Sequence, residues 1–327
     1  MDRRTAAGIG LVVISAAGYG SGSILAAPIY STGVDWLTLV GWRFLIGATV
    51  GWVWVLGSPG RRASLRRMSR RQLAVALSLG ALFTGNAGTY YASLETVPAA
   101  LAGVVVYTYP VMVAILSLWF ATRLPGRRPW IAAALAVAGS ALALGGIDVA
   151  HAPPLGGLVL VFLSGFIYSV WIILSARLSG ERRDHLAPDT TESGSPAGDA
   201  AVTTTVMMTA TGLVYAIAAL ALGRPLDPGA VPATAWPGIV AVAFVASFLA
   251  IQTFYAGATR IGAARAALTA TIEPLIIVVL AWIFLHQQLA PIQLAGAVLI
   301  VGGVVIAQTS PRPAGAPEPA TPLEAEG

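Results

Sequence analysis

The sequence predicts an all-α integral membrane protein with ten transmembrane helices, arranged as two inverted five-helix repeats. Three observations lead to this prediction: the composition, the number of long apolar segments, and a passage that occurs twice. Apolar residues make up 57% of the 327-residue chain and charged residues 10%, whereas soluble domains carry about 25% charged residues. A chain this apolar would expose too much hydrophobic surface in water.

A spanning helix needs about 20 mostly apolar residues. Ten such segments are expected at 5–26, 34–56, 73–94, 99–121, 129–147, 155–178, 202–222, 235–257, 263–285 and 291–309. A closed β-barrel would instead show short segments of alternating hydrophobicity. The first segment could also be read as a cleaved signal, because Arg3 and Arg4 precede it. Its counterpart in the second half, segment 155–178, favours a retained helix.

One passage of the sequence occurs twice, at 90–110 and again at 254–274. At a constant offset of 164, Tyr91 meets Tyr255 and Pro110 meets Pro274. Both passages lie at the same place within a five-helix unit. Two similar halves are the usual plan of a secondary transporter, whose substrate site lies near the midplane where the halves meet.

Arginine placement predicts the orientation, because the chain has no lysine. With the N-terminus inside and ten crossings, 17 of the 19 arginines fall in inside segments, while Arg224 is outside and Arg43 lies within the second helix. This bias predicts a multi-pass protein of the cell membrane with both termini cytoplasmic. Five helices per half then make the repeats inverted. The basic run 61–71 resembles a nucleic-acid patch, but it is better explained as a topology signal in contact with anionic lipid.

The expected organisation is a first repeat at 1–150 and a second at 151–309. Within the second, residues 179–200 are polar and rich in Ser, Gly, Pro and acid, which is typical of a flexible cytoplasmic linker. Residues 310–327 are rich in proline and glutamate and are expected to form a disordered cytoplasmic tail.

Several segments resemble the drug/metabolite transporter superfamily, in particular its EamA branch of ten-helix carriers. The matching residues are Trp42-Arg43-Phe44, the small-residue runs that lead to Pro110 and Pro274, Glu273 itself, and the run from Gln293 to Ala307. The resemblance covers roughly residues 8–309 and implies a transporter whose helices line a central path. It departs from the family where acids often follow helices 4 and 9, since this chain has Thr122-Arg123 and His286-Gln287 there.

Two charged residues are expected near mid-membrane depth. Glu273 is the only acid deep in a predicted span, ten residues into 263–285, and intramembrane ionisable residues indicate function by default. It could couple protons, bind a substrate ammonium group, or anchor the helix beside Pro274. Arg43 lies nine residues into 34–56 and could pair with Glu273, with backbone carbonyls or with a substrate carboxylate.

A group of polar and aromatic side chains completes the candidate substrate site, because a small organic ligand needs an apolar cavity with a few placed polar groups. Together with Glu273 and Arg43 they are Asn86, Tyr107, Tyr109, Tyr168, Trp171, Gln252 and Thr269. The alternative is that such tyrosines belong to interfacial belts. Helices 1, 3, 4, 6, 8 and 9 are expected to line the path.

An enzyme finds little support. The chain has no cysteine or lysine, no aspartate in a predicted span, and its three histidines lie in loops or at helix ends, so zinc and Ser-Lys chemistry lack their ligands. No metal, cofactor or nucleic acid is expected. The partners are a small-molecule substrate and the bilayer, with protons open as a coupling ion and the oligomeric state open. Export of amino acids, drugs or related compounds by alternating access is favoured, and a non-transporting membrane scaffold is the alternative.

Overall fold

The predicted all-helical fold is confirmed by the computed structural model of the chain. It describes residues 3–109, 152–178, 199–224, 226–261, 269–270 and 272–308, with a few single positions between 112 and 142. These residues form helices and turns and contain no strand. Most of the predicted span 129–147, the linker 179–200 and the tail 310–327 lie outside the described residues.

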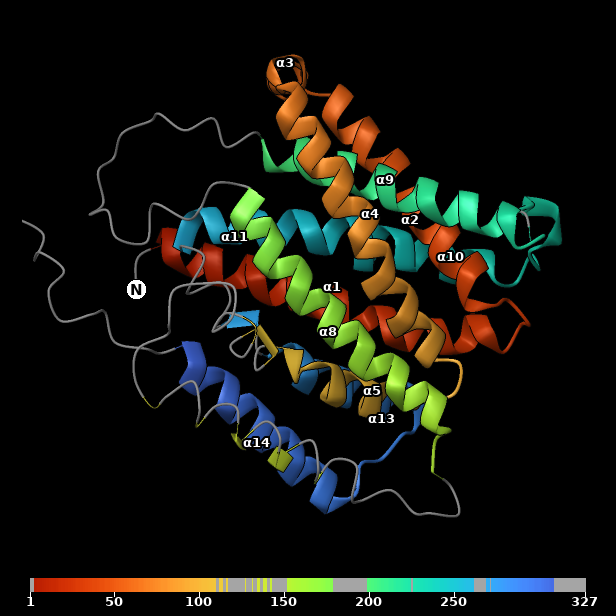
Figure 1. Ribbon diagram of the computed structural model, residues 1–327, viewed down its shortest axis with the longest axis vertical. Coiled ribbons are helices and arrows are strands. Elements are labelled where there is room, and N and C mark those ends of the chain that lie inside the picture. The colour runs from red at the N-terminus through yellow and green to blue at the C-terminus, as the bar shows by residue number, and fades with distance from the viewer. Residues whose placement is uncertain are drawn as a thin grey trace, which may run out of the picture.

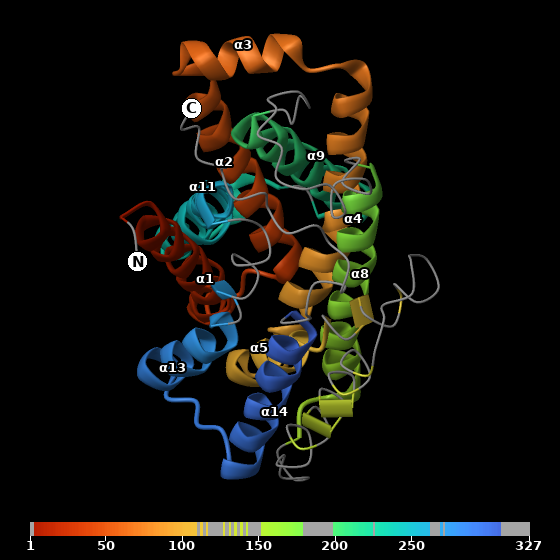
Figure 2. The same cartoon turned by 90° about the vertical axis from the view of Figure 1, so that its left-hand side faces the viewer.

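The first half follows the predicted spans and adds one helix. Helices α1 (Arg3–Tyr30), α2 (Trp36–Leu56) and α4 (Arg70–Ser93) match the first three spans, and α5 (Ala99–Val106) is the start of the fourth. Between α2 and α4, helix α3 (Pro59–Arg67) lies across their ends (Figure 2). From sequence this basic stretch was expected to be a loop between two spans that carries the topology signal, and its helix was not predicted.

The second half is also helical along its described length. Its elements are α8 (Leu155–Leu178), α9 (Ala200–Ala221), the short η3 (Pro228–Ala230), α10 (Trp236–Ala241), η4 (Val242–Leu249), α11 (Ala250–Ile261), α13 (Glu273–Leu285) and α14 (Pro291–Gln308). Five described helical stretches are long and apolar enough to cross a membrane: 5–30, 36–56, 155–174, 201–221 and 236–254. The last of these joins α10, η4 and the start of α11, and its middle part η4 is a π-helix.

Local polar contacts define where the helices of the first half begin. The Asp35 carboxylate accepts a hydrogen bond from the Thr38 backbone N–H at 2.7 Å, which caps α2. Ser69 and Gln72 form a reciprocal capping box at the start of α4. Such caps satisfy backbone donors that a helix cannot satisfy internally, so both helices start at sharply defined residues.

The contacts between helices repeat from one half to the other. Helix α1 packs against α11 and α13, while α8, its counterpart, packs against α4 and α5, the counterparts of those two helices. Likewise α4 contacts α9, and η4 contacts α2. The two halves are therefore interleaved and do not form separate bodies, because helices of each half pack against helices of the other.

The helix ends fall on two sides of the molecule. In Figure 1 the N-terminus, the first residues of α9 and the last residues of α8, α11 and α14 all lie toward the left, and the opposite ends of α1, α8 and α9 lie at the right. This is the alternation that successive crossings of one membrane require.

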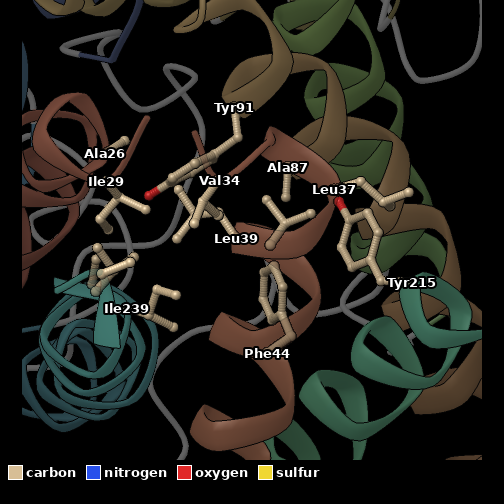
Figure 3. Packing of buried hydrophobic residues seen from close by; sticks show 14 of the residues in the cluster. Ala26, Ile29, Val34, Leu37, Leu39, Phe44, Ala87, Tyr91, Tyr215 and Ile239 are labelled. Atoms are coloured by element: carbon tan, nitrogen blue, oxygen red, sulfur yellow. The ribbon is translucent and has the colours of Figure 1, made fainter. Parts of the chain in front are cut away.

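The largest buried cluster joins both halves and positions the helices around the centre. Phe44 of α2 stacks on Tyr215 of α9 with ring centroids 5.9 Å apart, as Figure 3 shows. The Tyr215 hydroxyl donates to the Thr84 carbonyl of α4 at 2.6 Å. Because a buried hydroxyl needs such a partner, this contact fixes α4 against α2 and α9.

Both repeated passages are interrupted where continuous helices were expected. Helix α5 ends at Val106 and a turn follows at 107–108, and helix α13 begins only at Glu273, after a turn at Ile272. Each break lies within four residues of the proline that ends the repeat. Proline lacks the N–H that a helix needs and clashes with the carbonyl four residues earlier. The predicted spans 99–121 and 263–285 therefore each contain an interruption close to the proline.

Candidate functional site

Tyr107 and Glu273 meet where the two interrupted helices face one another. The Tyr107 hydroxyl lies 2.9 Å from Glu273 Oε2 and 3.3 Å from the backbone carbonyl oxygen of Ala270. Ala270 is four residues before Pro274, so its carbonyl has no helical N–H donor. Tyr107 itself is 5% exposed. One buried hydroxyl is therefore shared between the carboxyl group and the carbonyl that the proline leaves unpaired.

This pair connects equivalent parts of the two repeats. At the offset of 164, Tyr109 of the first passage corresponds to Glu273 of the second, and each directly precedes the repeated proline. The Tyr109 ring packs edge-on against Tyr107, with centroids 5.5 Å apart. Corresponding positions of the two halves thus carry different side chains, the aromatic ring of Tyr109 and the carboxyl group of Glu273, and both contact Tyr107.

Aromatic rings extend from this pair across α8 to α4. The Tyr109 and Tyr168 rings are 4.8 Å apart, Tyr168 stacks on Trp171 at 5.8 Å and 13°, and Phe83 of α4 is 5.6 Å from Trp171. The Trp171 ring N–H donates to the Leu79 carbonyl at 2.9 Å. The structure therefore brings four of the predicted site residues into one group with Glu273: Tyr107, Tyr109, Tyr168 and Trp171.

Tyr109 gives a test of whether this aromatic group binds substrate. Tyr109 is half-buried and its ring contacts Tyr107 and Tyr168. We expect Tyr109→Ala to reduce transport severalfold while the amount of folded protein falls much less, because the aromatic contact surface is lost. Tyr215→Ala, which removes a fully buried ring of the main cluster, is the comparison for packing. Equal losses of transport and of folded protein in Tyr109→Ala would leave packing as its only role.

Arg43 has other partners than Glu273. Its Nε donates to Ser247 Oγ at 2.6 Å and its Nη2 to the Ala246 carbonyl at 3.2 Å, both in η4. Its guanidinium also lies over the Tyr91 ring, 4.6 Å from the centroid. The Arg43 side chain is 7% exposed. Of the alternatives open from sequence, the structure shows a backbone carbonyl, and it adds the Ser247 hydroxyl, which was not foreseen. Arg43 thus joins the first half to the π-helix of the second.

The remaining predicted site residues are held by neighbouring helices. Asn86 Nδ2 donates to the Ser164 carbonyl and hydroxyl at 3.1 and 3.0 Å, and the Ser164 hydroxyl lies 3.1 Å from the Asn86 carbonyl. Gln252 Nε2 lies 3.3 Å from Thr204 Oγ1. Thr269 precedes Ala270 and lies within the interrupted helix. Asn86 thus ties α4 to α8, and Gln252 ties α11 to α9.

The sequence analysis missed the partners of these polar groups. Ser247 was hidden within a continuously apolar run, and the π-helix around it has no sequence signal in the hydrophobic pattern. Such π segments occur often at functional sites. Ser169 Oγ donates to the Tyr109 carbonyl at 2.9 Å and to the Gly165 carbonyl at 2.7 Å. Its place one residue after Tyr168, within a span, was the only hint of this contact.

A recess of about 220 Å³ opens near the loops at the far ends of α1 and α4, and its lining includes Ser23, Glu95 and Gln287. The apolar cluster of Ile24, Ala99, Ala100, Ile277 and Ala281 lies beside it, and Ala99 belongs to both. Ile277 is one helical turn from Glu273. This cluster, called the apolar plug below, therefore lies next to the recess and includes a residue one helical turn from Glu273.

These features define a multi-pass membrane protein with two interleaved repeats and a half-buried acid between interrupted helices. A family model described as the EamA-like transporter family matches the chain twice, over residues 6–145 and 155–309. The chain belongs to this family, and the predicted two-repeat architecture is confirmed.

One solved structure, titled only "Crystal structure of protein", is 21% identical, with a TM-score of 0.59 over 93% of this chain and 96% of that chain, and its likeness shows the fold. No curated protein matches this sequence.

Proposed function

We propose that this protein exports small organic molecules, such as amino acids, drugs or related metabolites, across the cell membrane by alternating access. The observation that carries the proposal is the Tyr107–Glu273 pair, which links the interrupted helices of the two repeats at 2.9 Å. Interrupted helices at corresponding positions in two halves are the strongest sequence-readable pointer to a transporter's substrate site. The family supports a membrane transporter of small molecules, and we propose no enzymatic activity.

Protons are the coupling ion that this geometry fits. When Glu273 is ionised, the Tyr107 hydroxyl donates to its carboxylate at 2.9 Å. When Glu273 carries a proton, the acid can donate to the Tyr107 oxygen, and the Tyr107 hydroxyl can turn to the Ala270 carbonyl at 3.3 Å. In both protonation states the Glu273 carboxyl group and the Tyr107 hydroxyl are therefore hydrogen-bonded to each other, which avoids the cost of leaving either group unsatisfied. Movement of the apolar plug at Ile277 would then connect Glu273 to the recess.

The substrates that fit have an apolar or aromatic body and few charges. The Tyr107–Tyr109–Tyr168–Trp171 group offers ring faces and edges, and Glu273 is the one acid among them. Aromatic rings beside a carboxylate can hold the ammonium group of an amino acid or amine through cation–π and charge contacts. The aromatic surface therefore contacts the apolar body of the substrate, and Glu273 binds the ammonium group of the substrate.

An efflux measurement tests the proposed function. Cells that produce the chain are loaded with labelled amino acids and hydrophobic amines, and release is compared with that of cells that do not produce it. Faster release of at least one amine- or amino-acid-bearing compound by the parent protein is expected. Equal release from both cell lines for every compound, with the protein present in the membrane, would favour the non-transporting scaffold.

Orientation can be measured separately because the chain has no cysteine. We expect Gln288→Cys, an exposed site after α13, to react with an impermeant maleimide in intact cells, and Thr190→Cys in the linker to react only after the cells are opened. Gln288 is preferred to Gln287, whose side chain accepts from the Ala100 backbone N–H at 3.2 Å. Reaction of Thr190→Cys in intact cells would reverse the proposed topology.

A further inference from the structure

Helix α3 forms a basic recess that the transport site does not use. A hollow of about 390 Å³ is lined by Pro59, Arg62, Ala63, Arg66 and Arg67. Arg62, Arg66 and Arg67 are exposed, and no residue of α3 is buried. Figure 2 shows α3 lying across the ends of α2 and α4 rather than parallel to them. It is therefore a helix on the surface of the bundle, at the end where its two neighbours leave the membrane.

The positive charge of this recess has no internal counter-charge in the described structure. The segment from Trp36 to Leu94 contains no acidic residue. The ion pair found among the described residues, Arg224 with Asp35 at 3.5 Å, involves other elements. Arg62 and Arg66 are four residues apart and share a helix face, an arrangement that is destabilising for like charges on their own. An anion in the recess would remove that repulsion.

Apolar groups beside the recess distinguish a lipid from a free anion. Val53, Trp54 and Leu56 at the end of α2 are 69%, 44% and 52% exposed. The Arg61 guanidinium lies 3.9 Å from the centre of the Trp54 ring and its Nη1 donates to the Trp54 carbonyl at 3.2 Å. Tryptophan and arginine in this arrangement are typical of the level of the lipid headgroups. The arginines thus lie within a few residues of a surface suited to acyl chains.

We propose that α3 is a binding site for an anionic phospholipid, with Arg62, Arg66 and Arg67 holding the phosphate group and the exposed end of α2 contacting the acyl chains. Arginine suits this role because its planar N–H groups bind phosphate oxygens in pairs. Helix α3 also contacts α9 of the second half. A bound lipid would therefore connect the headgroup layer to both repeats at this surface.

The proposal is tested on the full chain reconstituted in vesicles. Ser64→Cys, which lies in α3 but does not line the recess, carries one fluorophore, and its quenching by brominated phosphatidylglycerol is compared with that by brominated phosphatidylcholine. We expect the parent protein to favour phosphatidylglycerol roughly tenfold, and Arg62→Gln/Arg66→Gln to lose most of this preference, since each surface arginine is worth about 1 kcal/mol toward anionic lipid.

The matched control is Arg70→Gln/Arg71→Gln, which removes the same charge from α4 but does not touch the recess. It should change the preference less than about twofold, since its charges act at longer range through screening salt. If both double variants lost the preference for phosphatidylglycerol equally, that preference would come from the overall positive charge of this surface and not from a site in the recess. Displacement of phosphatidylglycerol by millimolar inorganic phosphate would mean a site for small anions instead. Because Arg62 and Arg66 are exposed, both variants should remain folded, and Arg62→Lys/Arg66→Lys should keep part of the preference.

Discussion

Glu273→Gln is expected to reach the membrane in normal amounts and to lose at least about tenfold in transport rate, or to lose the dependence of transport on pH. Glutamine keeps the size of the side chain and an oxygen that can accept from Tyr107, whose hydroxyl lies 2.9 Å from the acid. It cannot gain or release a proton. An ionised carboxyl group at mid-membrane depth costs a few kcal/mol. We expect a functional role to offset this cost, with Glu273 acting in its charged form, its neutral form, or both in turn. The measurement is efflux at several pH values, normalised to the amount of protein.

Two variants separate the roles of Glu273. Asp227→Asn is the matched control, because the exposed Asp227 carboxylate also accepts a hydrogen bond, from the Gly229 backbone N–H at 2.8 Å, and lines neither recess. It should leave transport and its pH dependence nearly unchanged. Tyr107→Phe keeps the ring and removes the hydroxyl that Glu273 and Ala270 share, so it should shift the pH dependence of transport while the Glu273→Gln variant lacks one. Full, pH-responsive transport by Glu273→Gln would leave Glu273 only a structural role beside Pro274.

The sequence could predict the fold because its signals are local and strong. The sequence contains ten long apolar segments, a repeated passage, and arginines concentrated on one side of the membrane. Each of these follows from what a bilayer requires of a single chain that crosses it repeatedly. The described helices α1, α2, α4, α8, α9 and α14 begin and end within a few residues of the predicted spans. The repeat was visible because Pro110 and Pro274, with the alanines before them, are needed in both halves.

The site was predicted less completely, because its contacts depend on distant residues. Arg43 is buried and Glu273 is half-buried; a pair between them was one of the alternatives from sequence, but the hydroxyl groups of Ser247 and Tyr107 that these two side chains contact were not foreseen as their partners. Ser247 meets Arg43 only because η4 follows a π-helical path. Tyr107 meets Glu273 only because both helices are interrupted at their prolines. The sequence indicated that these prolines would disturb their helices, but it did not indicate which side chain would hydrogen-bond to the carbonyl group left unpaired.

Gly80→Ala is expected to destabilise the fold by about 1–3 kcal/mol, the usual cost of forcing an extra group into a well-packed interior. A Cβ at Gly80 would lie 2.3 Å from the backbone oxygen of Met207 and 2.9 Å from the Cβ of Ala210. A backbone atom cannot turn away as a flexible side chain can, so α4 and α9 would have to separate. The Thr211 hydroxyl, which donates to the Gly80 carbonyl at 2.7 Å, would then keep only the Met207 carbonyl of its own helix, 3.0 Å away, as an acceptor.

The control for Gly80→Ala is Gly10→Ala in α1, where an added Cβ would meet no atom within 4 Å. Alanine is the better helix former by up to about 1 kcal/mol, so Gly10→Ala should be neutral or stabilising. Thermal unfolding of the purified proteins in one detergent and the yield of monodisperse protein measure both variants. Because α4 and α9 come from different repeats, loosening their contact should also reduce transport in step with stability, unlike the selective loss expected for Glu273→Gln. If Gly80→Ala were as stable as Gly10→Ala, the close approach of α4 to α9 would not be part of the packed fold.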